Sequence, residues 1–372
     1  MTARLKLRMF AHSWISDWNH GNAHFLRGLA SELIRLGHDV RCYEETPSWS
    51  MLNLMKEGSE KAVDTVRLFW ESFPSLDVRF FSNDQSFSRF AAEELREADV
   101  VLIHEWTAPE VVSTILSLKS KLGFCALFHD THHRAYTCPQ EIMRLPLHQF
   151  DGVLAFGEAI RRIYAEGFGI RRTWTFQEAA DTQKFCPLRM EKDTDVLWVG
   201  NWGDEERTRE LEEFLIGPAS AMRDRNIAVH GVRYPAEARR KLSQAGIEYR
   251  GYLCNLKAPT TYAKAVLALH VPRRYYSNGL SGVPTIRMFE SLACGTPLVC
   301  SPWTDKEELF RAGEDYVCAA DGRAMEAEIR NLLRDDLARQ QLASNGLETI
   351  QRRHTCAHRA VELLDICEEL GR

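Results

Sequence analysis

The sequence predicts an α/β protein with two domains, and three observations support this fold class. Short apolar runs rich in Val, Leu, Ile and Phe alternate with amphipathic helical stretches, the pattern of parallel sheets covered by crossover helices. The 372 residues exceed the usual domain size of about 100–200 residues. Residues 177–193 are polar, contain Pro187 and show neither hydrophobic period, so they mark the boundary between the domains.

Each side of this boundary has enough strand candidates for its own sheet. Before it, the expected strands are residues 5–11, 39–43, 78–81, 100–104, 124–128 and 152–156. After it, they are residues 196–200, 227–230, 247–252, 267–271, 297–300 and 315–318. From Ala324 onward, apolar residues at helical spacing predict C-terminal helices.

The composition limits the class of function. The chain has 47 Lys and Arg against 52 Asp and Glu, and the net charge of −5 gives no positive field that would gather nucleic acid, so we expect no bulk nucleic-acid binding. We find no export signal and no run of about 18 apolar residues, and therefore expect no membrane span. The ten cysteines are scattered without a C-x-x-C pair, which is typical of reduced thiols in a cytoplasmic protein.

The segment after the first expected strand predicts the opening of a βαβ unit. Apolar residues recur at helical spacing over residues 25–36, and His20, His24 and Arg27 are spaced to share a second face of that helix. The start of this face lies at the carboxyl edge of the sheet, where α/β proteins form their sites. For His24 and Arg27 we favour a solvated face, and for His20 a functional role. No G-x-G-x-x-G fingerprint follows the strand, so a nicotinamide dinucleotide site is poorly supported.

A second candidate site lies in the C-terminal half. A loop rich in Gly, Ser and Pro feeds a helix that we expect to begin near Pro284 or Thr285. Loop amides and the positive end of the helix dipole can hold a diphosphate. Arg287 and Glu290 lie three residues apart on this helix, so a phosphate ligand stands beside a hydroxyl acceptor. The alternative is an ordinary surface ion pair.

The run TIRMFESLACGTPLV resembles the donor-site helix of retaining GT-B enzymes of glycosyltransferase family 4. It is more closely similar to the spore-maturation CgeB-type branch, with its pattern R-x-F-E-x-L-A-C-G. Four further segments resemble the family in the same order: W-x-H-G-N-A-H-x-x-R-G-L near the N-terminus, EAADTQKFCP, LWVGNWGDEERTRELEEFL, and IEYRGYL with TYAKAVLALHVPR. The resemblance spans nearly the whole chain.

This resemblance implies the GT-B fold, in which two Rossmann-like domains face a cleft and C-terminal helices pack back toward the N-terminal domain. The implied N-terminal, acceptor-side domain is residues 1–176, followed by the linker at 177–193. Residues 194–345 then form the nucleotide-sugar-binding domain, and residues 346–372 a C-terminal helix that crosses back.

The resemblance also implies roles for individual residues. Glu290 is expected to hydrogen-bond the nucleotide ribose, with Arg287, Thr285 and Arg207 near the diphosphate. Gly200 and Asn201 would line the cleft, and the backbone near Tyr252 and Leu253 would read the base. These residue types suit the ligand, because guanidinium groups match phosphate oxygens and a carboxylate matches a diol.

The sequence departs from the family pattern at two positions. The wider family has a second acidic residue eight positions before the glutamate, and here that position is Gly282. Because this carboxylate normally contacts the sugar, the sugar and the retaining outcome are less secure than the nucleotide. The usual lysine after the donor-domain loop is out of register, so Arg207 or Arg209 would replace it.

The segment HDTHH places His129, Asp130, His132 and His133 on an expected loop just beyond an apolar strand. Three histidines within five positions, without a helical spacing, do not favour a metal site. The resemblance implies that His129 or Asp130 orients the acceptor or the sugar, while His132 and His133 are structural. If the enzyme inverts, Asp130 or His20 is the candidate general base.

We therefore predict a glycosyltransferase that moves a sugar from a nucleoside-diphosphate sugar to an unidentified acceptor, with retention favoured over inversion. We expect no metal and no other cofactor, because the resemblance implies that protein cations and helix dipoles stabilise the leaving diphosphate. Two alternatives stay open. One is a nucleotide-sugar epimerase of the same architecture, and the other is a binding protein without catalysis, for which Gly282 is the motivating feature.

Overall fold

The computed structural model describes residues 4–203 and 205–372 and divides the chain into two compact units. The N-terminal unit contains the chain up to Glu178 together with Cys356–Arg372, and the C-terminal unit is Ala179–Thr355. The division between Glu178 and Ala179 falls inside the polar segment at 177–193.

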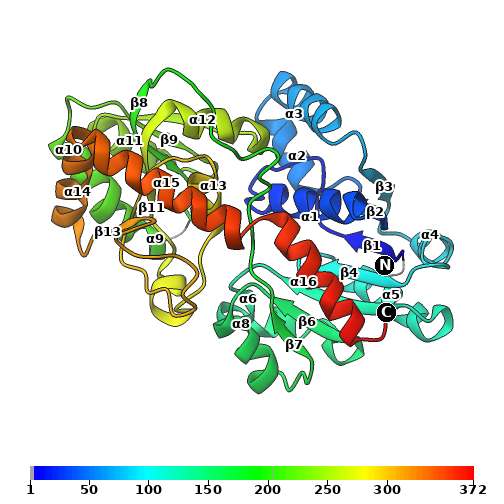
Figure 1. Ribbon diagram of the computed structural model, residues 1–372. Helices are drawn as coiled ribbons and strands as arrows, with labels where there is room; N and C mark the ends of the chain where they lie inside the picture. Colours follow the sequence, from blue (N-terminus) through cyan, green and yellow to red (C-terminus); the bar gives the residue numbers. More distant parts are fainter. Residues whose placement is uncertain (1–3, 204) are drawn as a thin grey trace. The chain divides into compact units, whose positions relative to one another are not determined.

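The N-terminal unit is built on a parallel sheet of seven strands, in the order β3-β2-β1-β4-β5-β6-β7 (Figure 1). All six strands expected in this half are confirmed, and the short edge strand β7, which is Thr-Trp-Thr and only half-buried, was not expected. The strands are β1 Lys6–Phe10, β2 Asp39–Glu45, β3 Asp77–Phe81, β4 Val100–His104, β5 Cys125–Asp130, β6 Gly152–Ala155 and β7 Thr173–Thr175.

Helices and short helical turns connect these strands. They are α1 Ala23–Arg35, α2 Trp49–Lys56, α3 Ser59–Ser72, α4 Phe87–Glu94, α5 Pro109–Leu122, α6 Arg134–Thr137, α7 Pro139–Ile142, η1 Leu147–Gln149, α8 Glu158–Arg162 and η2 Ile163–Gly167. The last helix of the chain, α16 Cys356–Glu369, belongs to this unit and packs along α1.

Two expectations for the first helix are wrong. Helix α1 begins at Ala23, so His20 lies in the preceding turn and shares no helical face with His24 and Arg27. His24 and Arg27 are also buried rather than solvated, with exposed fractions of 0% and 1%. The physical reason for Arg27 is that the loop after β1 and the Phe69 ring of α3, whose centre is 5.1 Å away, cover its guanidinium.

The buried guanidinium of Arg27 is compensated by acceptors of the loop that follows β1. Its Nε donates to the Trp14 carbonyl oxygen at 2.7 Å, and Nη2 donates to the Ile15 carbonyl oxygen at 2.9 Å. Nη1 donates to Asp17 Oδ2 at 3.3 Å. Arg27 therefore fixes the course of this loop, because a buried charge requires such partners.

The C-terminal unit has a parallel sheet of six strands, in the order β10-β9-β8-β11-β12-β13. All six strands expected here are confirmed, with ends that differ by a few residues. They are β8 Thr194–Val199, β9 Ile227–His230, β10 Ile247–Gly251, β11 Ala265–His270, β12 Leu298–Cys300 and β13 Val317–Cys318. The helices and turns are α9 Glu205–Leu211, η3 Glu212–Ile216, α10 Gly217–Ala221, α11 Ala236–Gln244, η4 Asn255–Lys257, α12 Ala258–Lys264, η5 Tyr275–Gly279, α13 Ile286–Ala293, α14 Gly322–Arg334 and α15 Asp336–Arg353.

The C-terminal end differs from the single helix expected over residues 346–372. Helix α15 ends at Arg353 and packs on α13 of the C-terminal unit, whereas α16 packs on α1 of the N-terminal unit. The expected return of a C-terminal helix to the N-terminal domain is thus confirmed for α16.

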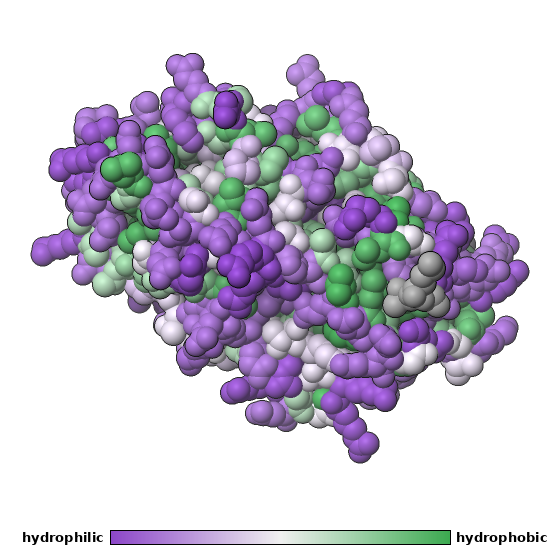
Figure 2. Space-filling model, viewed as in Figure 1, coloured by the Kyte–Doolittle hydropathy of each residue, from purple (hydrophilic) through white to green (hydrophobic). Residues whose placement is uncertain are grey.

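Both units follow the usual division between apolar core and polar surface. The face drawn in Figure 2 is mainly hydrophilic, with hydrophobic residues in small groups.

No helix in the described part of the chain is both long enough and apolar enough to cross a membrane. All ten cysteines lie within the described residues and have free thiols, and most of them are buried.

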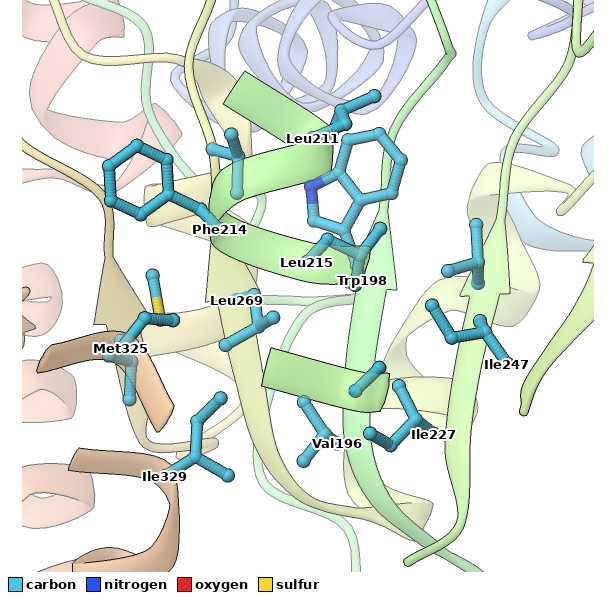
Figure 3. Close-up of a cluster of buried hydrophobic side chains, with 14 of the residues drawn as sticks. Val196, Trp198, Leu211, Phe214, Leu215, Ile227, Ile247, Leu269, Met325 and Ile329 are labelled. Atoms are coloured by element: carbon cyan, nitrogen blue, oxygen red, sulfur yellow. The ribbon is translucent and has the colours of Figure 1, made fainter. Parts of the chain in front are cut away.

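The core of the C-terminal unit is formed where α9, η3 and α14 cover one face of the sheet (Figure 3). Leu269 of the central strand β11 is 4% exposed and belongs to this cluster. Because strand and helix residues interlock in this layer, removing one large side chain leaves a cavity.

We expect Leu269→Ala to lower the free energy of unfolding by about 2–5 kcal/mol, through lost burial and a cavity. Leu337→Ala is the matched control, because Leu337 of the same unit is 78% exposed. Chemical denaturation of both variants tests this, and an equal loss of stability in the two would contradict the assignment of Leu269 to the core.

Candidate functional site

The C-terminal unit gathers polar side chains where its strand order reverses. All strands are parallel, so their carboxyl ends meet at one edge of the sheet. The order changes direction between the neighbours β8 and β11, and sites of open α/β sheets form at such points. Gly200 and Asn201 follow β8, and His270 is the last residue of β11.

Glu290 lies on α13 with 0% of its surface exposed. Its carboxylate accepts hydrogen bonds from Arg287 Nη1 at 2.5 Å, Tyr262 OH at 3.1 Å and Asn255 Nδ2 at 3.3 Å. Burial and the carboxylate raise the pKa of Tyr262 well above its usual range, so this hydroxyl remains a donor. The Arg287–Glu290 pair is therefore not the exposed surface pair that was the alternative interpretation.

His270 connects the end of β11 to the start of α13. Burial keeps the Cys300 thiol protonated by raising its pKa, and this thiol lies 3.5 Å from His270 Nδ1. Nε2 of the same ring lies 2.8 Å from Thr285 Oγ1, so His270 links Cys300 to Thr285 by hydrogen bonds.

Two arginines approach His270. Burial, together with the positive charges of Arg207 and Arg287, lowers the pKa of His270 to about 3. The imidazole is therefore neutral. Because Arg207 is on α9 and Arg287 on α13, the fold brings together two cations that are 80 residues apart in the sequence.

Arg207 is held at the edge of the sheet. Its Nη2 donates to the Val271 carbonyl oxygen at 2.5 Å, and its guanidinium lies 5.2 Å from the centre of the Trp198 ring. Arg209 of the same helix is exposed. Of the two arginines considered in place of the family lysine, only Arg207 is near His270 and Arg287.

The other residues expected at the donor site lie around the same edge. Gly200 accepts a hydrogen bond from Tyr234 OH at 2.7 Å, and Asn201 Oδ1 accepts one from the Val232 amide at 2.8 Å. Tyr252 and Leu253 follow β10 and are partly exposed. Sequence reasoning missed Asn255 in the next turn, whose Oδ1 is buried without a hydrogen-bond partner.

Gly282 has a φ of +97°, a conformation that favours glycine over aspartate or glutamate. A Cβ atom at this position would lie 3.4 Å from a carboxylate oxygen of Glu307. The positive φ therefore explains why a glycine stands at position 282, and Glu307 places a carboxylate next to it.

The N-terminal unit gathers histidines at the corresponding edge of its own sheet. His129 and Asp130 are the last two residues of β5, which corrects their expected place on a loop beyond the strand. The ring centres of His104 and His129 are 5.6 Å apart, and those of His12 and His20 are 4.0 Å apart. His12 lies 5.6 Å from His104. The adjacent strands β1, β4 and β5 therefore bring four imidazoles together.

These imidazoles are neutral. Burial lowers the pKa of His129 to about 3 and that of His12 to about 4, and burial also holds the pKa of His20 and His104 well below the usual range. Neither ring nitrogen of His20 or His129 has a hydrogen-bond partner within the described residues. Neutral imidazoles offer one donor and one acceptor each.

Asp130 and Glu105 form a buried acidic pair beneath the histidines. Asp130 accepts from Tyr164 OH at 2.6 Å and from the His132 amide at 2.9 Å, and burial raises its pKa to about 6. Burial and the neighbouring Asp130 raise the pKa of Glu105 well above its usual range. Arg134 Nε donates to Glu105 Oε2 at 3.3 Å.

A chain of hydrogen bonds links this pair to the histidines. Thr131 Oγ1 lies 3.3 Å from Glu105 Oε1 and 3.0 Å from His104 Nε2. Sequence reasoning missed His12, His104 and Glu105. Their positions in the sequence could have indicated them, because His12 follows the first strand closely, His104 is the last residue of β4 and Glu105 comes next.

The side chains of the described residues do not group three or more His, Cys, Asp or Glu around a position for a metal ion. The unit can instead offer neutral hydrogen-bonding groups and an acid–base pair. His132 and His133 stack with ring centres 3.9 Å apart, and His133 Nδ1 lies 2.9 Å from Thr137 Oγ1.

Family models and known structures match this architecture. Residues 21–182 match the model described as Glycosyltransferase Family 4, and residues 207–365 match the model described as Glycosyl transferase-like. The two halves of the chain are thus related to glycosyltransferases. No curated protein matches the chain in sequence.

Solved structures resemble the chain over its full length. HepE from Anabaena, in complex with UDP and glucose, has a TM-score of 0.70 at 12% identity, covering 98% of this chain and 100% of that one. A glycosyltransferase from Rickettsia africae gives 0.69 at 10% identity, with 99% of both chains covered. Sucrose-phosphate synthase from Thermosynechococcus elongatus gives 0.65 at 14%, with 99% of both covered.

The chain has the GT-B glycosyltransferase fold. At these identities the similarity shows a shared fold, and the GT-B architecture assigns the two parallel sheets to its two Rossmann-like domains.

The raised pKa of Asp130 predicts a pH-dependent stability for this GT-B chain. Between about pH 4 and 6 the folded protein binds more protons than the unfolded chain, so this stabilisation is complete below the unfolded-state pKa and is lost as pH rises through about 6. The unfolding free energy of the wild type relative to Asp130→Asn should fall by up to about 3 kcal/mol between pH 4 and 7. Denaturation at several pH values measures this, and parallel curves would contradict it.

Proposed function

We propose that the chain transfers a glycosyl group from a nucleoside-diphosphate sugar, bound by the C-terminal unit, to an acceptor bound by the N-terminal unit. The observation that carries this proposal is that the charges of both Arg207 and Arg287 act on neutral His270, whose ring hydrogen-bonds Thr285 at the start of α13. Two guanidinium groups and a helix N-terminus suit the charge of a diphosphate.

The same groups suit the chemistry of transfer. As the bond between the sugar and the diphosphate breaks, negative charge grows on the leaving oxygens, and fixed cations stabilise this charge best. Thr285 adds a hydroxyl group, which is held by its hydrogen bond with His270 Nε2. We propose that these groups act without a metal ion.

We propose that Glu290 and the loop after β10 hold the nucleoside. Glu290 is fully buried and engaged by three donors, so a ribose hydroxyl reaches it only if one of these donors moves. The unpartnered Oδ1 of Asn255 is a further acceptor beside Glu290. Tyr252 and Leu253 would contact the base. UDP is the first nucleotide to test, because the HepE structure contains it.

Around the sugar of the donor, this chain departs most from the family pattern. We propose that the transfer keeps the configuration of the sugar, that the sugar is a hexose, and that the chain belongs to the CgeB-type branch. Gly200 and Asn201 would lie beside the sugar. Glu307 is the carboxylate nearest to Gly282 and would take the role of the family acid. The ten free thiols support a reducing compartment such as the cytoplasm.

In the N-terminal unit, we propose that His129 and Asp130 orient the acceptor or the transferred sugar. In an inverting reaction, Asp130 or His20 would take the acceptor proton. The pKa of Asp130, raised to about 6, suits a base that is ionised near neutral pH.

Arg287→Ala and Glu290→Gln test the donor site. We expect each to weaken UDP binding by about tenfold or more and to lower transfer from UDP-sugars, because a charge-assisted contact or the carboxylate that orients Arg287 is lost. Arg352→Ala and Glu348→Gln are matched controls, since this pair lies exposed on α15. Calorimetry with UDP measures binding, and unchanged binding and activity in both site variants would overturn the assignment.

Product analysis separates the three reaction classes. A transferase needs an acceptor to form a glycoside, whereas an epimerase converts the UDP-sugar alone and a binding protein does neither. We expect a glycoside to form only when an acceptor is present, and at most slow hydrolysis of the donor without one. NMR of the glycoside gives its anomeric configuration. Epimerised donor in the absence of acceptor would refute the proposed transfer.

A further inference from the structure

Trp106 forms an exposed aromatic surface directly after β4 in the N-terminal unit. Its side chain is 44% exposed, although an indole is usually buried. The Arg134 guanidinium lies 3.8 Å from the centre of the ring, so it covers one face. His12 and His132 contact the ring in edge geometry, at 6.4 and 5.2 Å between centres. The accessible surface is therefore mainly the opposite face.

Arg134 holds this ring in place. Its Nη2 donates to the Glu105 carbonyl oxygen at 2.5 Å, its Nε to Glu105 Oε2 at 3.3 Å, and its Nη1 to Glu141 Oε2 at 3.5 Å. The guanidinium is thus anchored on three sides and only 14% exposed. Trp106 is a preorganised platform, and its supporting cation is already matched by carboxylates.

Unsatisfied polar groups lie next to the platform. His20 is 6% exposed, and among the described residues neither of its ring nitrogens nor Nδ1 of His12 has a hydrogen-bond partner. The His12 ring is close to both His20 and Trp106, at 4.0 and 6.4 Å between ring centres. Buried polar atoms without protein partners are rare and costly, so these nitrogens are available to hydrogen-bond a ligand.

The charge of this corner selects against anions. Burial keeps His12 and His20 neutral, since it holds the pKa of His12 at about 4 and that of His20 well below its usual range. Arg134, the cation at the platform, is paired with Glu105 and Glu141. The Arg134 guanidinium is mostly buried and its donors are already hydrogen-bonded, so it is poorly placed to bind a phosphorylated or carboxylated ligand. An uncharged ligand ring with one apolar face and hydroxyl groups around its edge would match the aromatic face of Trp106 and the neutral imidazoles.

We propose that this corner, formed by Trp106, His12 and His20, binds the acceptor and that the acceptor is an uncharged carbohydrate. One face of a sugar ring packs on the open face of Trp106, and ring hydroxyls exchange hydrogen bonds with His12 and His20. This inference rests on the proposed glycosyl transfer, because it names the class of acceptor.

Binding in the absence of donor tests the site directly. Saturation-transfer NMR of the full chain with methyl hexosides and unmodified disaccharides should show binding to the wild type. Trp106→Ala should weaken it by about tenfold or more, as expected for loss of a tryptophan at the centre of a contact. Trp106→Phe should lose less, because it keeps an aromatic face. Trp70→Ala is the matched control, since Trp70 of α3 is 40% exposed and makes no contact with this corner in the structure.

Other ligands provide the opposing outcomes. Hexose phosphates and hexuronates should bind more weakly than the neutral sugars, and nucleosides should not compete. Absence of neutral-sugar binding to the wild type, tighter binding of the charged sugars, displacement by nucleosides, or wild-type affinity in Trp106→Ala would each overturn the proposal. Thermal unfolding of each variant shows whether a loss reflects misfolding.

Donor measurements separate this inference from the proposed function. In Trp106→Ala, UDP affinity and donor hydrolysis should match the wild type, while the acceptor KM rises by about tenfold or more. If the wild type binds neutral sugars but no nucleotide, the proposed transfer fails and the sugar site stands. If nucleotides bind and neutral sugars do not, the acceptor assignment fails alone.

Discussion

The buried carboxylate of Glu290 is the interaction on which the C-terminal unit depends most. Removing a carboxylate from water costs several kcal/mol unless charged and hydrogen-bonding partners replace the solvent. Its three donors come from η4, α12 and α13, so one carboxylate ties three elements together. Arg287 is thereby held near the start of α13, close to His270 and Arg207.

The N-terminal unit uses burial in the opposite way. Its histidines have few partners, and desolvation favours their neutral form, so they remain donors and acceptors without charge. The ionisable groups at this edge are the acids Glu105 and Asp130, whose pKa values burial raises, and Arg134, which pairs with Glu105. One unit therefore concentrates positive charge suited to a diphosphate, and the other offers neutral hydrogen bonds suited to hydroxyl groups.

The two sites share a geometric cause. Parallel strands end at one edge of their sheet, and the order reverses next to the first strand of each unit. Loops at that point diverge, so residues such as Asn201, His270, His12 and His104 collect there from distant parts of the chain. The strands contribute packing, while their last residues and the loops after them contribute chemistry.

The sequence by itself determined the α/β class, because apolar runs and helical periodicity reflect which faces are buried. It also located α13 with Arg287 and Glu290, since a glycine-rich loop before an amphipathic helix is a local pattern. Tertiary structure alone decided the burial of His24 and Arg27, because no local pattern records that the loop after β1 and Phe69 of α3 cover the Arg27 guanidinium. It also decided the pairing of His12 with His20 and His104, and of Trp106 with Arg134, because no local period records which strand ends become neighbours.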